Sequence, residues 1–338
     1  MKRIAKLVLV AFCLAYMVVV LGAYVRLSDA GLGCPDWPVC YGRIVPPIAE
    51  QEIEAANTAF PHRPVEMAKA WKEQVHRYSA SVLGLLIAAL AVLVYRHRDH
   101  SMQPVVLPIF LVVLVIFQGL LGMWTVTLLL KPLFVMLHLL GGMTTLLLLW
   151  WLNLRLSATM PGRGTAGRAD IYHWAWLAMA IVYTQIALGG WTSSNYAALA
   201  CRDFPTCHGS FWPPMDFKNA FVLWRGLGVS YEYGVLDAPA RTAIHFTHRL
   251  GAMITALVIL VLGIRCLRDP RPVLRHTGGV LIGALVLQIA LGVSNVLYGL
   301  PLPVAVAHNA GAALLLLLVG SVLYFSRRPS GLPGSKND

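Results

Sequence analysis

Apolar residues run along this chain in eight long stretches separated by polar segments. They cover roughly residues 7–25, 77–95, 104–129, 133–153, 171–192, 243–264, 278–298 and 304–325. A helix rises about 1.5 Å per residue, so about 20 apolar residues cross the roughly 30 Å hydrocarbon layer of a membrane. Each stretch is close to that length, and none carries an unpaired charge deep inside. The pattern predicts an all-α integral membrane protein with eight transmembrane helices.

Composition and charge agree with a membrane protein. Of 338 residues, 58% are hydrophobic and 12% are charged, whereas a soluble domain has about 25% charged residues. A net charge of +12 could suggest a nucleic-acid binder, but fifteen Lys and Arg and only four Asp and Glu lie at the ends and at every second junction. Lys and Arg resist translocation, so these segments and both termini are expected in the cytoplasm, with no nucleic-acid partner. The long loops, about 26–75 and 193–242, would then lie outside.

The first apolar stretch follows a short basic cluster, as the apolar core of a signal peptide does. It lacks a convincing small-residue cleavage site and is longer than a typical signal core. We expect it to be a retained first helix.

Four landmarks recur in the same order in the two halves of the chain. Both long loops contain Cys-x5-Cys-x-Gly, within segments 22–42 and 189–209, at an offset of 167 residues. The others are a His-Arg pair, a Gln-x3-Gly motif, and a histidine twenty residues after that glutamine, at offsets of 170 to 172. These are His76-Arg77 and His248-Arg249, Gln118-x3-Gly122 and Gln288-x3-Gly292, and His138 and His308. Four matches in register indicate an internal repeat.

The repeat predicts two four-helix bundles. With four helices in each half, both halves would have the same orientation, related by a pseudo-two-fold axis along the membrane normal, as in parallel-repeat transporters. We expect an N-terminal half at 1–156, a cytoplasmic linker at 157–170, a C-terminal half at 171–326 and a cytoplasmic tail at 327–338.

Each predicted bundle places two histidines near its outer face. His76 is expected to open the second helix and His138 to lie about a turn and a half into the fourth; His248 and His308 repeat this arrangement. A lone histidine in a membrane helix can simply join helices by hydrogen bonding. Two imidazoles at matched depth in each half are instead typical of axial ligands to heme iron, whereas zinc would need three or four ligands.

One position beside the histidines differs between the halves. Glu73 precedes His76 by three residues and shares its helix face, whereas the matching residue before His248 is His245. A carboxylate in one half suggests that only the first half carries out chemistry. The alternative is a glutamate that stabilises the start of a helix through its dipole.

An arginine directly follows the first histidine of each pair, at Arg77 and Arg249. Its guanidinium fork matches a carboxylate, so it could bind a heme propionate at the membrane surface. It could equally extend its charge to the interface without a ligand. Both interpretations stay open.

Two cysteine pairs lie in the predicted outer loops, Cys34 with Cys40 and Cys201 with Cys207. Disulfides persist in oxidising compartments outside the cytoplasm. We interpret both pairs as structural disulfides. The alternative is a redox role, in which exposed disulfides exchange electrons.

These motifs together resemble the heme A synthase family, whose bacterial and mitochondrial members convert heme O to heme A. The motifs are RLSDAGLGCPDWPVCYG, Glu73-x-x-His76-Arg77, Gln118-x3-Gly122 with His138, CRDFPTCHG with FWPP, and LWRGLGVSYEYGVLDAPARTAIHFTHR. The resemblance covers essentially the whole chain, and the last of these motifs looks especially like the proteobacterial form. In this order on eight helices, the set is highly specific.

The resemblance implies a role for each histidine pair. His76 and His138 would bind the substrate heme O, and His248 and His308 would hold a resident heme b. Glu73 matches the glutamate that is implicated in catalysis in the family. The reaction hydroxylates the methyl group at ring carbon 8 successively, and the gem-diol loses water to leave a formyl group. Some members lack the first cysteine pair and the second is more variable, so neither is obligatory.

Two axial histidines leave no open position on iron for oxygen. Either one histidine detaches, or the methyl group loses electrons and is captured by water, with Glu73 taking protons or stabilising positive charge. We favour the second route. The second-half heme would then relay electrons, which suits a closed bis-histidine site.

The expected setting is a bacterial inner membrane, with both heme sites near the outer side. Expected partners are heme O and heme A, membrane lipid, an electron donor such as a quinol or small redox protein, heme O synthase, and assembly factors of terminal oxidases. A quinone-coupled thiol-disulfide oxidoreductase would explain the cysteines but neither the histidines nor the repeat. A non-catalytic diheme electron-transfer cytochrome would explain the histidines but require nothing of Glu73.

Overall fold

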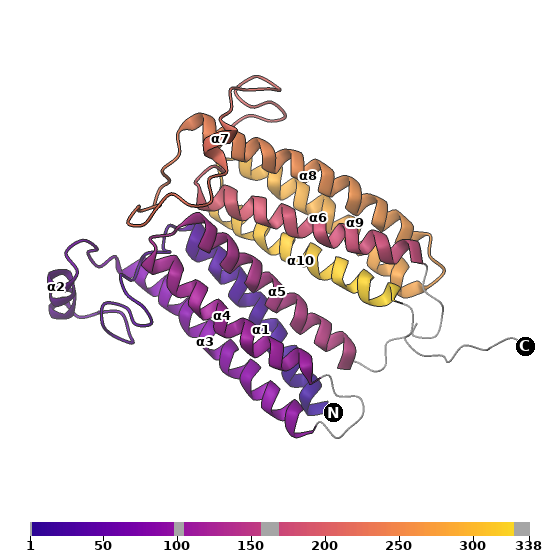
Figure 1. The fold of residues 1–338 in the computed structure, drawn as a ribbon, viewed down its shortest axis with the longest axis horizontal. Helices are drawn as coiled ribbons and strands as arrows, with labels where there is room; N and C mark the ends of the chain where they lie inside the picture. Colours follow the sequence, from indigo (N-terminus) through magenta and orange to yellow (C-terminus); the bar gives the residue numbers. More distant parts are fainter. Residues whose placement is uncertain (1, 98–104, 157–168, 328–338) are drawn as a thin grey trace, which may run out of the picture.

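The computed structural model describes residues 2–97, 105–156 and 169–327, and this part of the chain is helical without strands (Figure 1). Eight of its helices are long and apolar enough to cross a membrane, as the hydropathy pattern predicted. The chain is therefore a multi-pass membrane protein. The long helices are α1 (Lys2–Leu27), α3 (Met67–Arg96), α4 (Val106–Thr127), α5 (Pro132–Leu156), α6 (Ala169–Ser194), α8 (Ala238–Leu267), α9 (Pro272–Leu297) and α10 (Leu302–Ser326).

Two short helices, α2 (Glu50–Ala59) and α7 (Phe217–Ala220), lie in the long loops and were not predicted. Of the predicted cytoplasmic linker, residues 157–168 lie outside the described residues, and α6 begins at Ala169. The tail beyond residue 327 also lies outside them.

Two helices begin earlier than the apolar pattern indicates. α3 begins at Met67, so the prediction that His76 opens its helix is wrong: that residue lies about two and a half turns inside it. α8 begins at Ala238, where the Asp237 side chain accepts a hydrogen bond from the Ala240 N–H (3.1 Å). His248 therefore lies nearly three turns inside its helix, and the matching prediction for it is wrong as well. The first two to three turns of each helix include polar residues, among them Glu73 and His245, which contact the loops. A search for continuous apolar residues therefore misses these turns.

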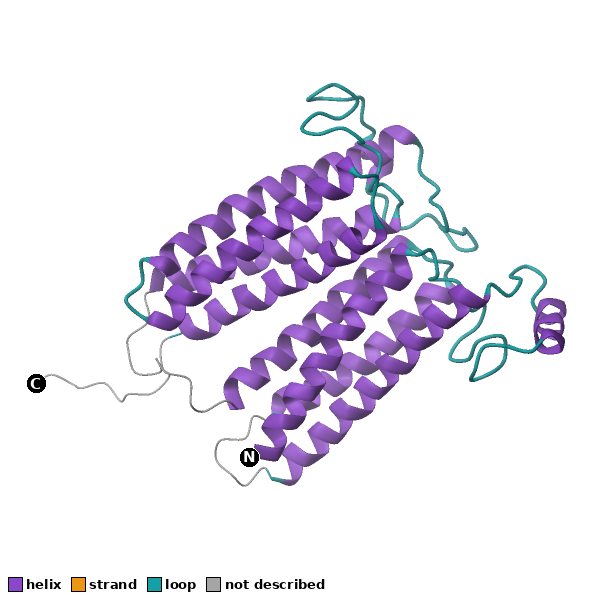
Figure 2. Ribbon diagram, turned by 180° about the vertical axis from the view of Figure 1, so that it is seen from behind, coloured by secondary structure: helices purple, strands orange, loops and turns teal. Residues whose placement is uncertain are grey.

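The long helices form two rings of four. In the first half, α1 and α4 each pack against both α3 and α5; in the second, α6 and α9 each pack against both α8 and α10 (Figures 1 and 2). Helices α3 and α5 are therefore diagonal neighbours across the first bundle, and α8 and α10 are diagonal neighbours across the second. Inward-facing residues on a diagonal pair meet at the bundle centre.

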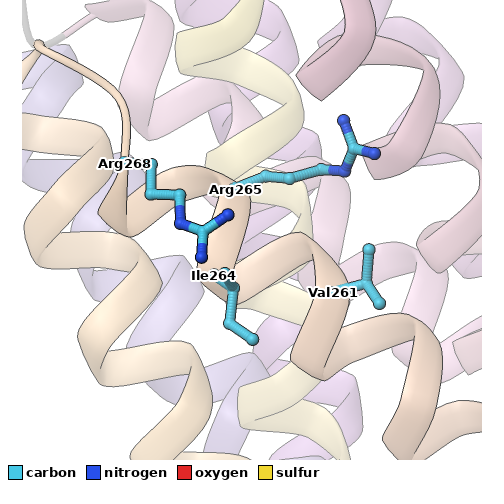
Figure 3. Close-up of a pocket in the computed structure, with 4 residues that line it drawn as sticks. All are labelled: Val261, Ile264, Arg265 and Arg268. Carbon is cyan, nitrogen blue, oxygen red and sulfur yellow. The ribbon is translucent and has the colours of Figure 1, made fainter.

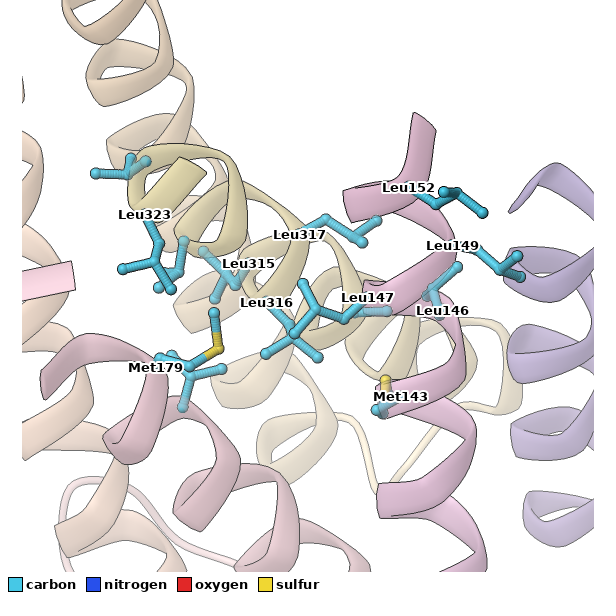
Figure 4. Packing of buried hydrophobic residues seen from close by; sticks show 14 of the residues in the cluster. Met143, Leu146, Leu147, Leu149, Leu152, Met179, Leu315, Leu316, Leu317 and Leu323 are labelled. Atoms are coloured by element: carbon cyan, nitrogen blue, oxygen red, sulfur yellow. The ribbon is translucent and has the colours of Figure 1, made fainter. Parts of the chain in front are cut away.

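The two bundles pack together through α1, α5, α6 and α10. Leu147 of α5 and Met179 of α6 belong to one apolar cluster that continues through both halves (Figure 4). A Cβ atom at Gly320 would lie 2.6 Å from the Leu147 side chain, so the glycine allows a close approach. The Trp150 indole also donates to the Ser321 hydroxyl (2.8 Å). Lipid is as apolar as leucine, so close packing and such hydrogen bonds hold the halves together.

The long segments 28–66 and 195–237 lie at the same end of the molecule, here called the loop end (Figures 1 and 2). Helix α1 begins and α10 ends at the opposite end. The candidate site residues lie in the parts of the helices near the loop end, together with the two loops that cover them.

Candidate functional site

His76 on α3 and His138 on α5 face each other at the centre of the first bundle. Their ring centroids are 6.5 Å apart and their planes cross at 83°. An imidazole nitrogen binds a transition metal at about 2 Å, so two rings that share one iron have centroids about 6 Å apart. The Nδ1 atoms of both rings are buried without a hydrogen-bond partner among the described residues. The separation and the unpaired nitrogens fit a shared heme iron.

His248 on α8 and His308 on α10 hold the corresponding positions in the second bundle. The two rings are close enough to interact electrostatically, and Nδ1 of His308 is buried without a partner in the described chain. Across the described ranges, no group of three or more His, Cys, Asp or Glu side chains could hold a metal ion. A pair of imidazoles suffices for heme iron, because the porphyrin supplies the other four ligands.

A glycine on the neighbouring helix lies against each of the four imidazoles. A Cβ atom added at any of these glycines would lie 3.0 to 3.5 Å from the Cε1 atom of the ring that it faces. The absent side chain therefore leaves room for the ring inside the bundle. The contacts are Gly22 with His76, Gly122 with His138, Gly189 with His248, and Gly292 with His308.

Glu73 is a buried carboxylate on the same face of α3 as His76, and 4% of its surface is exposed. Its Oε2 accepts a hydrogen bond from the Cys34 N–H (2.9 Å), and its Oε1 pairs with the Arg77 guanidinium (2.5 Å). Gly33 permits this approach, because a Cβ atom there would lie 2.5 Å from the α3 backbone. These two donors offset part of the cost of burying the charge.

His245 takes the position of Glu73 in the second bundle and is also 4% exposed. The Cys201 nitrogen lies 3.3 Å from its Nδ1, and the Arg249 Nε lies 3.3 Å from its Nε2. A neutral imidazole has only one acceptor nitrogen, so it satisfies one of these donors at a time. Both halves therefore share a contact between loop and helix, but the carboxylate occupies it only in the first.

Arg77 and Arg249 hold the turns of the two loops. Nη1 of Arg77 donates to the carbonyls of Asp36 (2.9 Å) and Val39 (2.6 Å). Arg249 donates in the same way to the carbonyls of Cys201, Asp203 and Thr206, at 2.8 to 3.0 Å. With the bond to His245, four of its five N–H donors are engaged. Nothing in the spacing of the motifs indicates this loop-holding role, and the propionate contact stays a prediction.

The two loops share one local structure. Each contains a disulfide, and an aspartate between its cysteines accepts backbone N–H groups from the turn that follows. In both turns the glycine after the second cysteine has a φ near +70°, which glycine adopts at little cost. The common pattern Cys-x-Asp-aromatic-Pro-x-Cys-x-Gly could have revealed this likeness from sequence. The disulfides join Cys34 to Cys40 and Cys201 to Cys207.

Two ionisable side chains in the loops are held in one protonation state. The Thr206 hydroxyl and the N–H groups of Gly209 and His208 keep the pKa of Asp203 well below its usual range. Burial raises the pKa of Tyr41 to about 12, so its hydroxyl stays protonated and can donate to the Pro64 carbonyl (3.2 Å). The ionised Asp203 carboxylate stabilises the turn, and this stability is lost only as the pH falls through its lowered pKa. The Asp203 turn should therefore persist in acid.

Residues 223–236 of the second long loop lie on the first bundle. The Tyr231 N–H donates to a carbonyl in the connection between α4 and α5 (3.0 Å), and Glu232 pairs with Arg63 (2.9 Å). Lys131, only 2% exposed, lies 3.5 Å from the centroid of the Trp224 ring. The second half thus contributes to the covering of the first-half site.

A separate hollow lies near the opposite end of α8. Val261, Ile264, Arg265 and Arg268 line it (Figure 3). It begins more than ten residues beyond His248, roughly 20 Å along the helix. It is therefore no part of the histidine sites.

Residues 5–319 match the family model COX15-CtaA, described as cytochrome oxidase assembly protein. The chain belongs to this family. It is 47% identical over 312 residues to a heme A synthase of Shewanella oneidensis, and this alignment covers 91% of this chain and 92% of the relative. Heme A synthases of Paracoccus denitrificans and Halalkalibacterium halodurans are each 28% identical, over 95% and 88% of this chain and 87% and 89% of their own lengths.

Proposed function

We propose that this protein is a heme A synthase, an oxidoreductase that converts heme O to heme A in the membrane. The family membership and the 47% identity with a relative of that name support the reaction. The observation that carries the proposal within the chain is the His76–His138 pair, with its rings 6.5 Å apart and a buried carboxylate one turn away.

The first half, residues 1–156, would hold the substrate, and the second half, 171–326, a resident heme b. His76 and His138 would be the axial ligands of heme O, and His248 and His308 those of heme b. A bis-histidine heme b supplies electron transfer. The first half is assigned the chemistry because Glu73 lies there, whereas His245 occupies the matched position.

Glu73 suits the proton transfers that the reaction requires. Oxidation of a methyl group to a formyl group, with water as the oxygen source, releases four electrons and four protons. A buried carboxylate beside the reacting group can accept these protons one at a time. The Cys34 N–H and Arg77 hold this carboxylate in place, so its position depends on the first loop.

We place the loop end on the outer side of the inner membrane and both termini in the cytoplasm. The excess of Lys and Arg in the segments opposite the loops supports this orientation. The disulfides at the loop end also suit an oxidising compartment. Both heme sites would then lie near the outer surface, within reach of a quinone or small redox protein that accepts the four electrons released on the water route. The expected electron donor, such as a quinol, would be needed only if molecular oxygen supplied the oxygen atom.

Extraction and chromatography of hemes from the purified protein test the proposal directly. After expression together with a heme O synthase, we expect heme B together with heme O or heme A. Heme B should persist when heme O is not supplied, because the second-half site does not need the substrate. Protein that carries heme B alone even when heme O is abundant would contradict the proposal.

The double variant Cys34→Ser with Cys40→Ser should lose stability but keep heme A synthesis. A native disulfide is worth about 2–4 kcal/mol, while the contacts of Arg77 and Glu73 would still hold the loop. Thermal unfolding and the yield of heme A measure the two effects, and the Cys201→Ser with Cys207→Ser variant is the matched control. Complete loss of activity in both variants would instead favour a thiol-disulfide oxidoreductase.

A further inference from the structure

Glutamine side chains reach across to both histidines of the second bundle. Nε2 of Gln185 on α6 donates to the His248 carbonyl (3.1 Å) and lies 3.1 Å from its ring Nδ1. Nε2 of Gln288 on α9 donates to the His308 carbonyl (3.0 Å) and lies 3.5 Å from its ring Nε2. Each histidine is thus tied to the neighbouring helix at its backbone, with the amide beside its ring.

A pair of glycines accompanies each of these glutamines. One lies four residues after the glutamine and faces the histidine ring, as Gly189 and Gly292 do. The other lies three residues after the histidine, at Gly251 and Gly311, where a Cβ atom would overlap the glutamine amide. We call this unit, Gln-x3-Gly on one helix and His-x2-Gly on the next, the glutamine clasp.

The first bundle has the residues of one clasp, at His138. Gln118 lies four residues before Gly122, and its amide lies against Gly141, three residues after the histidine. Nε2 of Gln118 has no hydrogen-bond partner in the described structure. His138 therefore has the glutamine and both glycines of a clasp beside it, but the hydrogen bond to its carbonyl is missing.

His76 has neither part of the clasp. Gly22 faces its ring as in the other three cases, but the residue four positions before that glycine is Val18. The residue three positions after the histidine is Ser79 in place of glycine. Valine cannot donate a hydrogen bond, and the buried Nδ1 of His76 has no partner in the described part of the chain. Of the four imidazoles, this one is the least restrained by its neighbours.

We propose that His76 is the exchangeable ligand of the first-half site, and that the glutamine clasps make both ligands of the second half permanent. This inference rests on the proposed function, since it concerns the same four histidines. A substrate heme must bind and leave in every cycle, so both of its bonds to histidine would have to break and reform, and the less restrained ligand would detach first, whichever route supplies the oxygen. A resident heme requires the opposite. The distribution of the clasps matches this difference, because both histidines of the second half are in a clasp and His76 is not.

The hydrogen bonds that His76 lacks are strong enough to change how readily it detaches. A hydrogen bond to a buried group shifts an equilibrium by about fivefold to tenfold. Transfer of a clasp from one half to the other should therefore shift the balance between attached and detached histidine by about that factor. Gln185 and Gln288 are positioning residues, because they hold the histidine ligands and do not contact the substrate.

Carbon monoxide binding to the reduced, heme-loaded protein tests the proposal without turnover, because the gas occupies only an iron position that a histidine has left. In the unmodified protein we expect about one of the two hemes to bind it. The variant Val18→Gln with Ser79→Gly installs a clasp at His76 and should weaken this binding about fivefold to tenfold. The reciprocal variant Gln185→Val with Gly251→Ser should make the second heme reactive as well.

The outcomes separate this proposal from the proposed function. Extracted hemes that include heme O or A show that the substrate site is occupied, whatever carbon monoxide does. With both sites occupied, equal reactivity of the two hemes, or no binding at all, would overturn the role of His76. Should the first variant fail to fold, the reciprocal variant decides: a second heme that stays unreactive would overturn the role of the clasp.

Discussion

Glutamine in place of Glu73 should stop heme A formation and leave heme O in the membrane. Glutamine keeps the size of the side chain, and its carbonyl oxygen can still accept the Cys34 N–H. It cannot take up protons, and it leaves the Arg77 guanidinium without its anionic partner. Loss of a general base typically costs about 10²- to 10⁴-fold in rate. Chromatography of extracted hemes measures the ratio of heme O to heme A.

Glu66 provides the matched control for this experiment. It lies seven residues earlier, directly before the first residue of α3, and it is exposed and pairs with Lys69 (2.8 Å). The Glu66→Gln variant should therefore make heme A at nearly the normal level. Normal heme A production by the Glu73→Gln variant would remove the main argument for chemistry in the first half.

Alanine in place of His248 or His308 should abolish the low-spin heme b spectrum of the purified protein. Each substitution would remove one proposed ligand of the heme b iron and leave a void inside a packed bundle, so the six-coordinate state that gives a low-spin spectrum would be lost. The His76→Ala and His138→Ala variants should instead impair conversion of heme O and spare the heme b signal. Absorbance of the reduced protein and extracted heme content measure the two effects separately.

An exposed histidine on α9, the helix that packs against both α8 and α10, controls for general damage. His276→Ala on α9 should preserve both the heme b spectrum and heme A synthesis, because its side chain lies on the outer surface of the bundle. A heme b spectrum that survives in both His248→Ala and His308→Ala would show that the second-half assignment is wrong.

The transmembrane helices were predictable from sequence because their cause is local. A membrane span needs only enough consecutive apolar residues, and the chain shows this eight times. The starts of α3 and α8 were not predictable in this way. The turns that precede the apolar stretches include Glu73 and His245, whose hydrogen-bond partners are the loop residues Cys34 and Cys201.

The sequence predicts which candidate residues recur at matched spacings, but it does not predict which side chains contact one another. The repeat indicates the four histidines and Glu73, but it does not indicate the Gln185-x3-Gly189 motif, because the first half has Val18 at the position that matches Gln185. Only the packing of α6 against α8 shows what that glutamine holds.

The sequence by itself determined the number of transmembrane helices, their order, and the residue types available for iron binding, because hydropathy and spacing act along the chain. Tertiary structure alone decided that α3 and α5 are diagonal neighbours, which brings His76 and His138 within 6.5 Å. It also decided that a loop of the second half covers the first, and that Glu73 is held by a loop amide nearly forty residues away. These contacts join segments distant in sequence, and their geometry comes from how the helices pack.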